Sequence, residues 1–171
     1  DPSTAESMIK TIDAVRKEGD TIGGTVALVG RGIPAGLGDP VFDKFQAVLA
    51  HALWSLPAVK SMEIGSGLHG TTMRGSAHND AFQTDENGQM RTMTNHSGGI
   101  QGGITNGEEL VVRIGFKPVS TLMKPQASVN AAGEAITLEG KGRHDPCVLP
   151  RAVPIVEAMT LLVLADRWLI N

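Results

Sequence analysis

The stretch NHSGGIQGGITNGEELVVRIGF, residues 95–116, decides the fold class of this chain. Its Asn106-Gly107 dipeptide is typical of a two-residue type I′ turn, which joins neighbouring antiparallel strands. The segments 97–105 and 108–116 on either side are therefore predicted to pair as a hairpin. Antiparallel pairing in a chain that also carries long helical patterns favours an α+β fold.

C-terminal to this hairpin, the sequence predicts a second hairpin and a long helix. Residues 129–138 form the weaker hairpin, around Ala132-Gly133. Residues 153–170 form the helix, which is apolar nearly all the way round: Ile155, Met159, Leu162, Val163 and Leu169. Such a helix is predicted to be buried on several sides.

N-terminal to the hairpin, the predicted order is helix, strand, helix, strand. A possible capping box at Ser3–Glu6 begins a helix over 4–18, and the β-branched segment 21–31 follows as a strand. Asp39-Pro40 is predicted to cap a second helix that ends near Pro57. That helix has a strong apolar stripe: Phe42, Phe45, Val48, Leu49, Ala52 and Leu53.

A short strand is predicted at 59–64, and no periodicity survives over 65–97. A loop of that length within a compact domain is usually functional or disordered. The prediction is therefore an α+β fold of long helices packed on antiparallel strands, over residues 1–171 as one unit.

The composition excludes several classes of protein. The chain has 171 residues and a net charge of -3, which argues against nucleic acid and anionic membranes as partners. No 18-residue apolar run is present, so no membrane span is expected. The single cysteine, Cys147, suits the reducing cytoplasm. The chain opens at Asp1 without a methionine, which suggests an engineered boundary or a cleavage product.

The first candidate for chemistry is the glycine-rich segment 98–103. Four glycines in six residues leave one face of a predicted strand without side chains. Either a flat or anionic ligand approaches this backbone, or the strand is bulged and packs closely on another backbone. The spacing is not G-x-G-x-x-G and no helix follows, so a Rossmann site is excluded.

The second candidate is the segment 117–121, Lys-Pro-Val-Ser-Thr. A rigid proline turn presents an ammonium, two hydroxyls and backbone N–H groups, which together could hold a phosphate. The alternative, which is the commoner one for an isolated match, is that the segment is only an ordinary turn that leaves a strand.

The third candidate is the segment 142–147, with Arg151 shortly after it. Arg143 could hold a phosphate bidentately, and Asp145 could act as a general base near the N-terminus of the last helix. The alternative is that Asp145-Pro146 is only a turn or a cap.

Three further sites are weaker hypotheses. A metal site is conceivable at His69, His78 and His96 with Asp80 and Asp85, but no ligand spacing supports it. A triad of Ser97, His96 and Asp145 lacks the G-x-S-x-G elbow. Cys147 is expected to be a packing residue and not a nucleophile.

Longer blocks give the chain a family resemblance. They are, in chain order, GLGDPVFDK (36–44), HALWSLPAVKS (51–61), EIGSG (63–67), NHSGGIQGGITNGE (95–108), FKPVST (116–121) and RHDPCVLPRAVPIVEAM (143–159). In this order the blocks resemble the C-terminal half of the chorismate synthases. The resemblance covers nearly the whole chain, so the family is identified on several blocks and not on one motif.

The resemblance implies an activity, a cofactor and a fold. Chorismate synthases eliminate phosphate in the anti-1,4 sense from 5-enolpyruvylshikimate 3-phosphate to give chorismate, and they need reduced FMN. Long helices lie between antiparallel sheets in a β-α-β sandwich, of which this chain would supply one half. The family enzyme is a cytoplasmic homotetramer.

The resemblance also implies roles for named residues. FMN would be contacted by residues of four segments: Ala58, Gly102, Lys117, Pro118, Val119, Ser120, Thr121 and Arg143. Asp145 would act catalytically in proton transfer beside the flavin. Pro57 stands where the family usually has asparagine, so a side-chain contact is lost there.

The resemblance further implies a missing N-terminal half, which carries two catalytic histidines and most of the substrate-binding arginines. The fragment alone is therefore expected to be inactive. Two alternatives stay open beside it: a stand-alone flavin- or phosphate-binding module, and a structural domain without catalysis.

Overall fold

The computed structural model describes residues 1–142 and 144–170. Its centre is a three-stranded antiparallel sheet in the order β1 (Gly24–Gly30), β7 (Leu110–Phe116), β2 (Val59–Ile64). Ile114 of the middle strand pairs with Val26 on one side and with Met62 on the other. Alternate residues of β7 are buried because successive side chains point to opposite faces: Leu110, Val112, Ile114 and Phe116.

Two helices, α2 (Phe45–Trp54) and α4 (Leu149–Ile170), pack on one face of this sheet and against each other. The core lies between them and the sheet, and its fully buried side chains include Phe45, Leu49, Leu53, Val112, Ile114 and Val156. The predicted α+β class, with helices on antiparallel strands, is confirmed.

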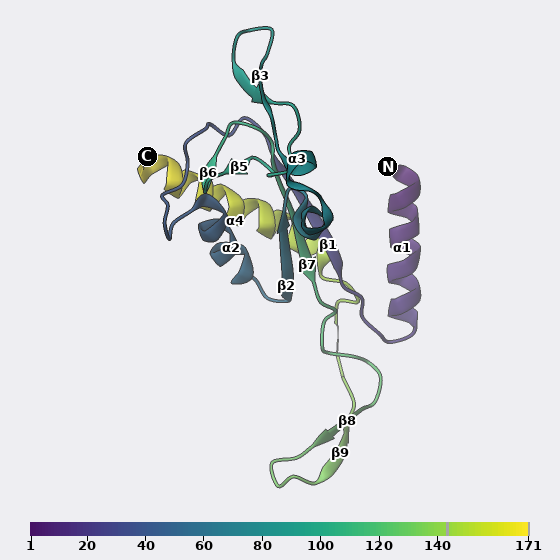
Figure 1. The fold of residues 1–171 in the computed structure, drawn as a ribbon. Coiled ribbons are helices and arrows are strands. Elements are labelled where there is room, and N and C mark those ends of the chain that lie inside the picture. Colours follow the sequence, from purple (N-terminus) through teal and green to yellow (C-terminus); the bar gives the residue numbers. More distant parts are fainter. Residues whose placement is uncertain (143, 171) are drawn as a thin grey trace.

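The first helix, α1 (Pro2–Lys17), matches the predicted helix over 4–18. Asp1 caps it by accepting a hydrogen bond from the Ser3 N–H at 3.0 Å. None of its residues is buried, and Figure 1 shows it standing beside the sheet, on the side away from α2 and α4.

The predicted start of the second helix was wrong. Asp39 and Pro40 do not cap it, because the Asp39 N–H bonds to the Asp43 carbonyl at 2.8 Å and closes a turn over these residues. The helix begins at Phe45, whose N–H bonds to the Gly103 carbonyl at 2.7 Å.

The predicted hairpin around Asn106-Gly107 was also wrong. β5 (Ile100–Gln101) pairs instead with β6 (Ile104–Thr105) across Gly102-Gly103. Both of these glycines have positive φ, +60° and +97°, which ends the strand early. β7 pairs instead with β1 on one side and with β2 on the other, over seven and five residue pairs.

The aperiodic segment 65–97 contains short elements. These are the 3₁₀ helix η1 (Gly67–Thr72), α3 (Gly75–His78), and a hairpin of β3 (Phe82–Thr84) and β4 (Met90–Thr92). A second hairpin, β8 (Gln126–Val129) with β9 (Ala135–Leu138), confirms the prediction around Ala132-Gly133. Figure 1 shows this hairpin projecting from the body.

The prediction that the last helix is buried on several sides was wrong for this chain. Its buried residues, Ala152, Val156, Thr160 and Val163, lie on one stripe. Leu162 and Leu169 are exposed at 65% and 86%, because α4 packs mainly against α2 and β1. Among the residues described, no helix has both the length and the apolarity to cross a bilayer.

Candidate functional site

The predicted contacts Ala58 and Lys117 lie side by side. The Lys117 N–H donates to the Ala58 carbonyl at 2.8 Å, where β7 ends and β2 begins. Ala58 has a φ of +69°, a left-handed conformation that costs a non-glycine residue about 1 kcal/mol. A residue held in such a conformation depends on its surroundings, and here the bond from Lys117 is part of them.

The segment 117–121 presents polar groups to solvent after it leaves β7. Lys117, Ser120 and Thr121 are exposed, while Val119 is half-buried. Gly23 lies directly beneath the segment, since a Cβ at that position would overlap the Phe116 carbonyl oxygen. The first residues of the β1 segment therefore approach this turn backbone to backbone, as glycine permits.

Asp145 and Thr121 line one small cavity of about 40 Å³ together with His144. The Asp145 carboxylate pairs with the Arg151 guanidinium at 2.9 Å, across the first turn of α4. The predicted second and third candidate segments thus meet, although they are more than twenty residues apart in the sequence. Arg143, the predicted flavin-contacting arginine, lies outside the described residues.

The wall of the same cavity includes Asp20 and Thr21, which precede β1. Asp20 accepts from the Lys124 ammonium at 2.6 Å and from the Thr21 N–H at 2.8 Å. The hydrogen bond from Lys124, and to a smaller extent the one from Thr21, lowers the pKa of the Asp20 carboxyl. The same bond to Asp20 raises the pKa of Lys124. Both groups are accordingly charged at neutral pH.

Gly102 lies apart from the other predicted contacts. It occupies the β5–β6 turn beside the N-terminus of α2, whereas Ala58 follows the C-terminus of that helix. Ten helical residues span about 15 Å. A Cβ on Gly102 would meet no atom within 4 Å, so nothing in the described chain requires a glycine there by close approach.

Two other glycines of the same segment do pack on backbone. A Cβ on Gly98 would overlap the Gly65 backbone, and one on Gly99 would lie 2.7 Å from the Glu109 carbonyl oxygen. For Gly98 and Gly99 the close-packing interpretation is therefore the correct one.

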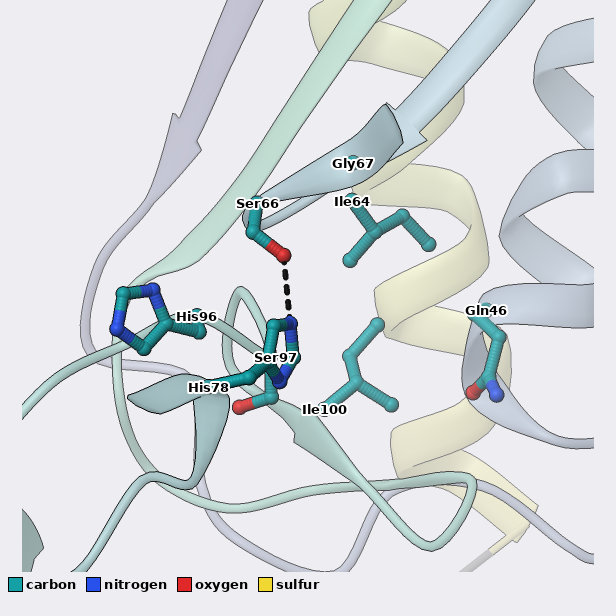
Figure 2. A pocket seen from close by; sticks show the side chains of 8 residues that line it. All are labelled: Gln46, Ile64, Ser66, Gly67, His78, His96, Ser97 and Ile100. Atoms are coloured by element: carbon teal, nitrogen blue, oxygen red, sulfur yellow. Dashed lines mark hydrogen bonds between the residues drawn. The ribbon is translucent and has the colours of Figure 1, made fainter. Parts of the chain in front are cut away.

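A second cavity, of about 300 Å³, lies at the other end of β2 and is drawn in Figure 2. Ser66 Oγ is 2.7 Å from His78 Nε2, and the His78 and His96 rings stack with centroids 5.4 Å apart. Figure 2 shows these side chains on one side of the cavity, with Gln46 on the other and Ile64 and Ile100 between them.

Asp80 holds the wall of this second cavity in place. Its carboxylate is buried and accepts from the Thr94 hydroxyl at 2.7 Å and from the His96 and Ser97 N–H groups at 2.8 Å each. Burial alone would raise the pKa of Asp80, but these hydrogen bonds lower it to about 2.

The weaker hypotheses fare differently. Ser97 and His96 lie beside Asp80 and line a different cavity from Asp145, so the imagined triad does not assemble. Within residues 1–142 and 144–170, no three His, Cys, Asp or Glu side chains converge as metal ligands. Cys147 is buried, which agrees with a packing role.

Sequence reasoning did not identify Asp20, Thr21 or Asp80 as residues that organise these sites. Asp20 and Thr21 read as a connection between helix and strand. Their partners lie 104 and 98 residues away in the chain, so no local pattern could have shown them. Asp80 appeared only as a weak metal candidate.

Comparisons with known proteins agree on one family. A family model described as Chorismate synthase matches residues 1–169. Chorismate synthases of Acaryochloris marina, Synechococcus elongatus and Cytophaga hutchinsonii are 62%, 60% and 57% identical over 98%, 99% and 100% of this chain.

This chain covers 46%, 47% and 48% of those three proteins, so it spans about half the length of the curated relatives it matches. A solved structure described as Crystal Structure of Chorismate Synthase superposes with a TM-score of 0.77 at 29% identity. That match covers 97% of this chain and 43% of the solved one.

Proposed function

The chain belongs to the chorismate synthase family, and we propose that it supplies the flavin-binding half of such an enzyme. The whole enzyme would eliminate phosphate from 5-enolpyruvylshikimate 3-phosphate and use reduced FMN. The observation that carries this proposal is the shared cavity of Thr121 and Asp145, beside the bonded pair Ala58 and Lys117.

The residues present fit a flavin phosphate at the 117–121 turn. Lys117, Ser120 and Thr121 are exposed there, so an ammonium and two hydroxyls are available to an anion. The backbone of the turn is held from below by Gly23 and from the side by Ala58. Pro118 and Val119 would line the ligand with their backbone and apolar atoms.

Asp145 is the residue that we propose for proton transfer. Its side chain is one-third exposed (33%) beside the small cavity that Thr121 also lines, and its carboxylate pairs with the Arg151 guanidinium at 2.9 Å. Reduced FMN, when bound, would lend electron density to the departing phosphate and take it back. The role of Asp145 would then be to accept or hold a proton beside the ring.

Two of the proposed FMN contacts, Arg143 and Gly102, are not among the described residues that meet at the 117–121 turn. Arg143 lies outside the described residues, and its proposed contact with FMN rests on the family resemblance of the 143–159 block. Gly102 and Ala58 lie at opposite ends of α2, a helix about 15 Å long, so we propose that a flavin held at Lys117 meets Gly102 only at its far end or in another copy of the chain. A homotetramer would supply such copies.

The missing half would provide the remaining groups for the substrate. Coverage of about half of each relative supports this division of the enzyme. The wide exposed apolar surface of α4 supports it too, since surfaces of that kind mark contacts with other protein. The buried free Cys147 agrees with our proposal of a reducing, cytoplasmic location.

Complementation tests the proposal. The unmatched half of the Acaryochloris marina chorismate synthase is expressed separately and mixed with this chain, reduced FMN and 5-enolpyruvylshikimate 3-phosphate. Chorismate should form in the mixture and not with either half alone. If the halves bind each other and FMN but no chorismate forms, the catalytic proposal is wrong and the binding-module alternative gains.

Flavin titration of the chain alone addresses the alternatives. We expect FMN binding weaker than micromolar, because half a site leaves the isoalloxazine ring open to water. Tight binding by the isolated chain would favour a stand-alone flavin module. No binding even in the complemented mixture would favour a purely structural domain.

A further inference from the structure

The linker between α1 and β1, residues 19–22, contacts both segments of the proposed flavin site. Its four residues bond to two distant stretches of chain. The contacts are Met123 N–H to the Gly19 carbonyl (3.0 Å), Lys124 Nζ to Asp20 Oδ2 (2.6 Å), Thr21 Oγ1 to the Val119 carbonyl (2.6 Å) and Ile22 N–H to the Pro146 carbonyl (2.8 Å). We call this segment the 19–22 linker.

The 19–22 linker bonds through backbone groups at its two ends and through side chains at its two middle residues. Gly19 and Ile22 use backbone groups, so these two bonds involve no side-chain donor or acceptor. Asp20 and Thr21 use side chains, so the identity of the residue matters there. Asp20 also accepts from the Thr21 N–H at 2.8 Å, so its two carboxylate oxygens bond to Thr21 and to Lys124.

Thr21 occupies the middle of this arrangement. Its hydroxyl donates to Val119, within the proposed flavin-phosphate turn, and the next residue bonds to Pro146, which directly follows Asp145. Thr21 also lines the cavity that Thr121 and Asp145 share. Thr21 and its neighbour Ile22 therefore link the proposed cofactor turn to the residue that follows the proposed proton-transfer group.

We infer that Thr21 is a positioning residue of the proposed flavin site, which acts by holding the backbone at Val119 at a set distance from Asp145. The inference rests on the proposed function, since it assumes that the 117–121 turn binds flavin and that Asp145 transfers a proton. Thr21 does not itself contact flavin or substrate in this inference. A displacement of about 1 Å in a catalytic group can lower the rate about 10²-fold, so the loss of one hydrogen bond at this point is expected to slow turnover.

The test uses a full-length hybrid in which this chain replaces the matching segment of the Acaryochloris marina relative. Thr21→Val removes the hydroxyl and keeps the shape, whereas Thr21→Ser keeps the hydroxyl. Thr25→Val makes the same chemical change at an exposed residue of β1 and serves as the matched control. Each variant is measured by amide hydrogen exchange without flavin, by FMN titration and by turnover.

Thr21→Val should speed hydrogen exchange in the 119–124 stretch about tenfold and weaken FMN binding about five- to tenfold per folded molecule, as expected for one lost hydrogen bond. Turnover at saturating FMN should fall further than this, because Asp145 is no longer at its set distance. Thr21→Ser should restore all three readouts to within about twofold, and Thr25→Val should leave them unchanged.

Two outcomes overturn the inference. One is that Thr21→Val behaves like Thr25→Val in hydrogen exchange and in FMN titration. The other is that Thr21→Ser is as damaging as Thr21→Val, which would show that the hydroxyl is not what matters. If the unmodified hybrid binds no FMN, the proposed function fails, and the hydrogen-exchange comparison alone then decides whether Thr21 holds the turn.

Discussion

The carboxylate of Asp80 accepts a hydrogen bond from the backbone N–H of His96 at 2.8 Å, across sixteen residues of aperiodic sequence. The adjacent Ser97 N–H and the Thr94 hydroxyl bond to the same carboxylate. One buried side chain therefore organises much of a segment in which local propensity predicts no structure. The segment 65–97 is an ordered part of the fold for this reason.

Asp80→Asn should destabilise the chain by about 2–4 kcal/mol. The charged acceptor is lost, and the amide NH₂ of asparagine is forced against one of the three donors. Urea unfolding of both proteins measures the difference. Asp85→Asn is the matched control, since Asp85 is only half-buried and accepts backbone bonds through one oxygen, Oδ1, that asparagine retains. A cost below 0.5 kcal/mol at Asp80 would contradict the role given to its charge.

The stability of the chain should depend on pH through the titration of Asp80. The pKa of Asp80 is about 2 in the folded chain, against an ordinary value of 3.8 that applies when the chain is unfolded. The ionised carboxylate therefore stabilises the folded chain at any pH above 3.8. Its contribution, about 2 kcal/mol, should be present at pH 5 and should disappear as the pH falls from about 4 to about 2. Unfolding curves of the native chain and of Asp80→Asn should accordingly converge at low pH, and parallel curves would show that Asp80 has an ordinary pKa.

Gly98→Ala and Gly102→Ala form a pair that separates conformation from packing. Both glycines have nearly the same φ, +64° and +60°. Gly102→Ala should cost about 1 kcal/mol for that conformation alone. Gly98→Ala should cost about 3 kcal/mol or more, because its Cβ would also overlap the Gly65 backbone. Equal losses of thermal stability would show that the backbone contact at Gly98 is unimportant.

Lys117→Met should weaken FMN binding by the complemented enzyme about tenfold, since the ammonium that we propose to hold the flavin phosphate is removed. Binding of riboflavin, which lacks the phosphate, should be unchanged. Lys60→Met removes an equivalent exposed charge from β2 and is the control. If riboflavin and FMN weaken equally, Lys117 acts on the ring or on folding and not on the phosphate.

Asp145→Asn should slow turnover of the full-length hybrid by about 10²-fold or more and leave FMN affinity within a few-fold. The reason is that asparagine keeps the size of the side chain but cannot accept a proton. Steady-state kinetics and flavin titration measure the two effects separately. Asp166→Asn, at an exposed position of α4, is the comparison variant. A large loss of flavin binding with normal turnover at saturating FMN would instead favour the turn-and-cap interpretation of Asp145-Pro146.

Elements with a local pattern were predictable, and elements held by distant partners were not. The first helix, the strands at 24–30 and 59–64 and the hairpin around Gly133 follow from periodicity and turn residues. Asn106-Gly107 does not predict the partners of β7. This strand pairs with β1 and β2, which lie far from it in the chain, and not with the adjacent segment 97–105. The burial of α4 was overestimated, since an apolar helix does not reveal how many neighbours this chain provides.

The sequence by itself determined the family, the α+β class and the residues proposed to contact flavin, since these depend on residue identity in ordered blocks. Only the tertiary structure decided which of those residues meet. It places Lys117 on Ala58 and Thr121 beside Asp145, and it separates Gly102 from them by the length of α2. Asp20 and Thr21 connect the start of β1 to the 119–124 stretch, and Asp80 holds residues 94–97 at the other cavity. These hydrogen bonds form only when burial of the core brings segments far apart in the chain together.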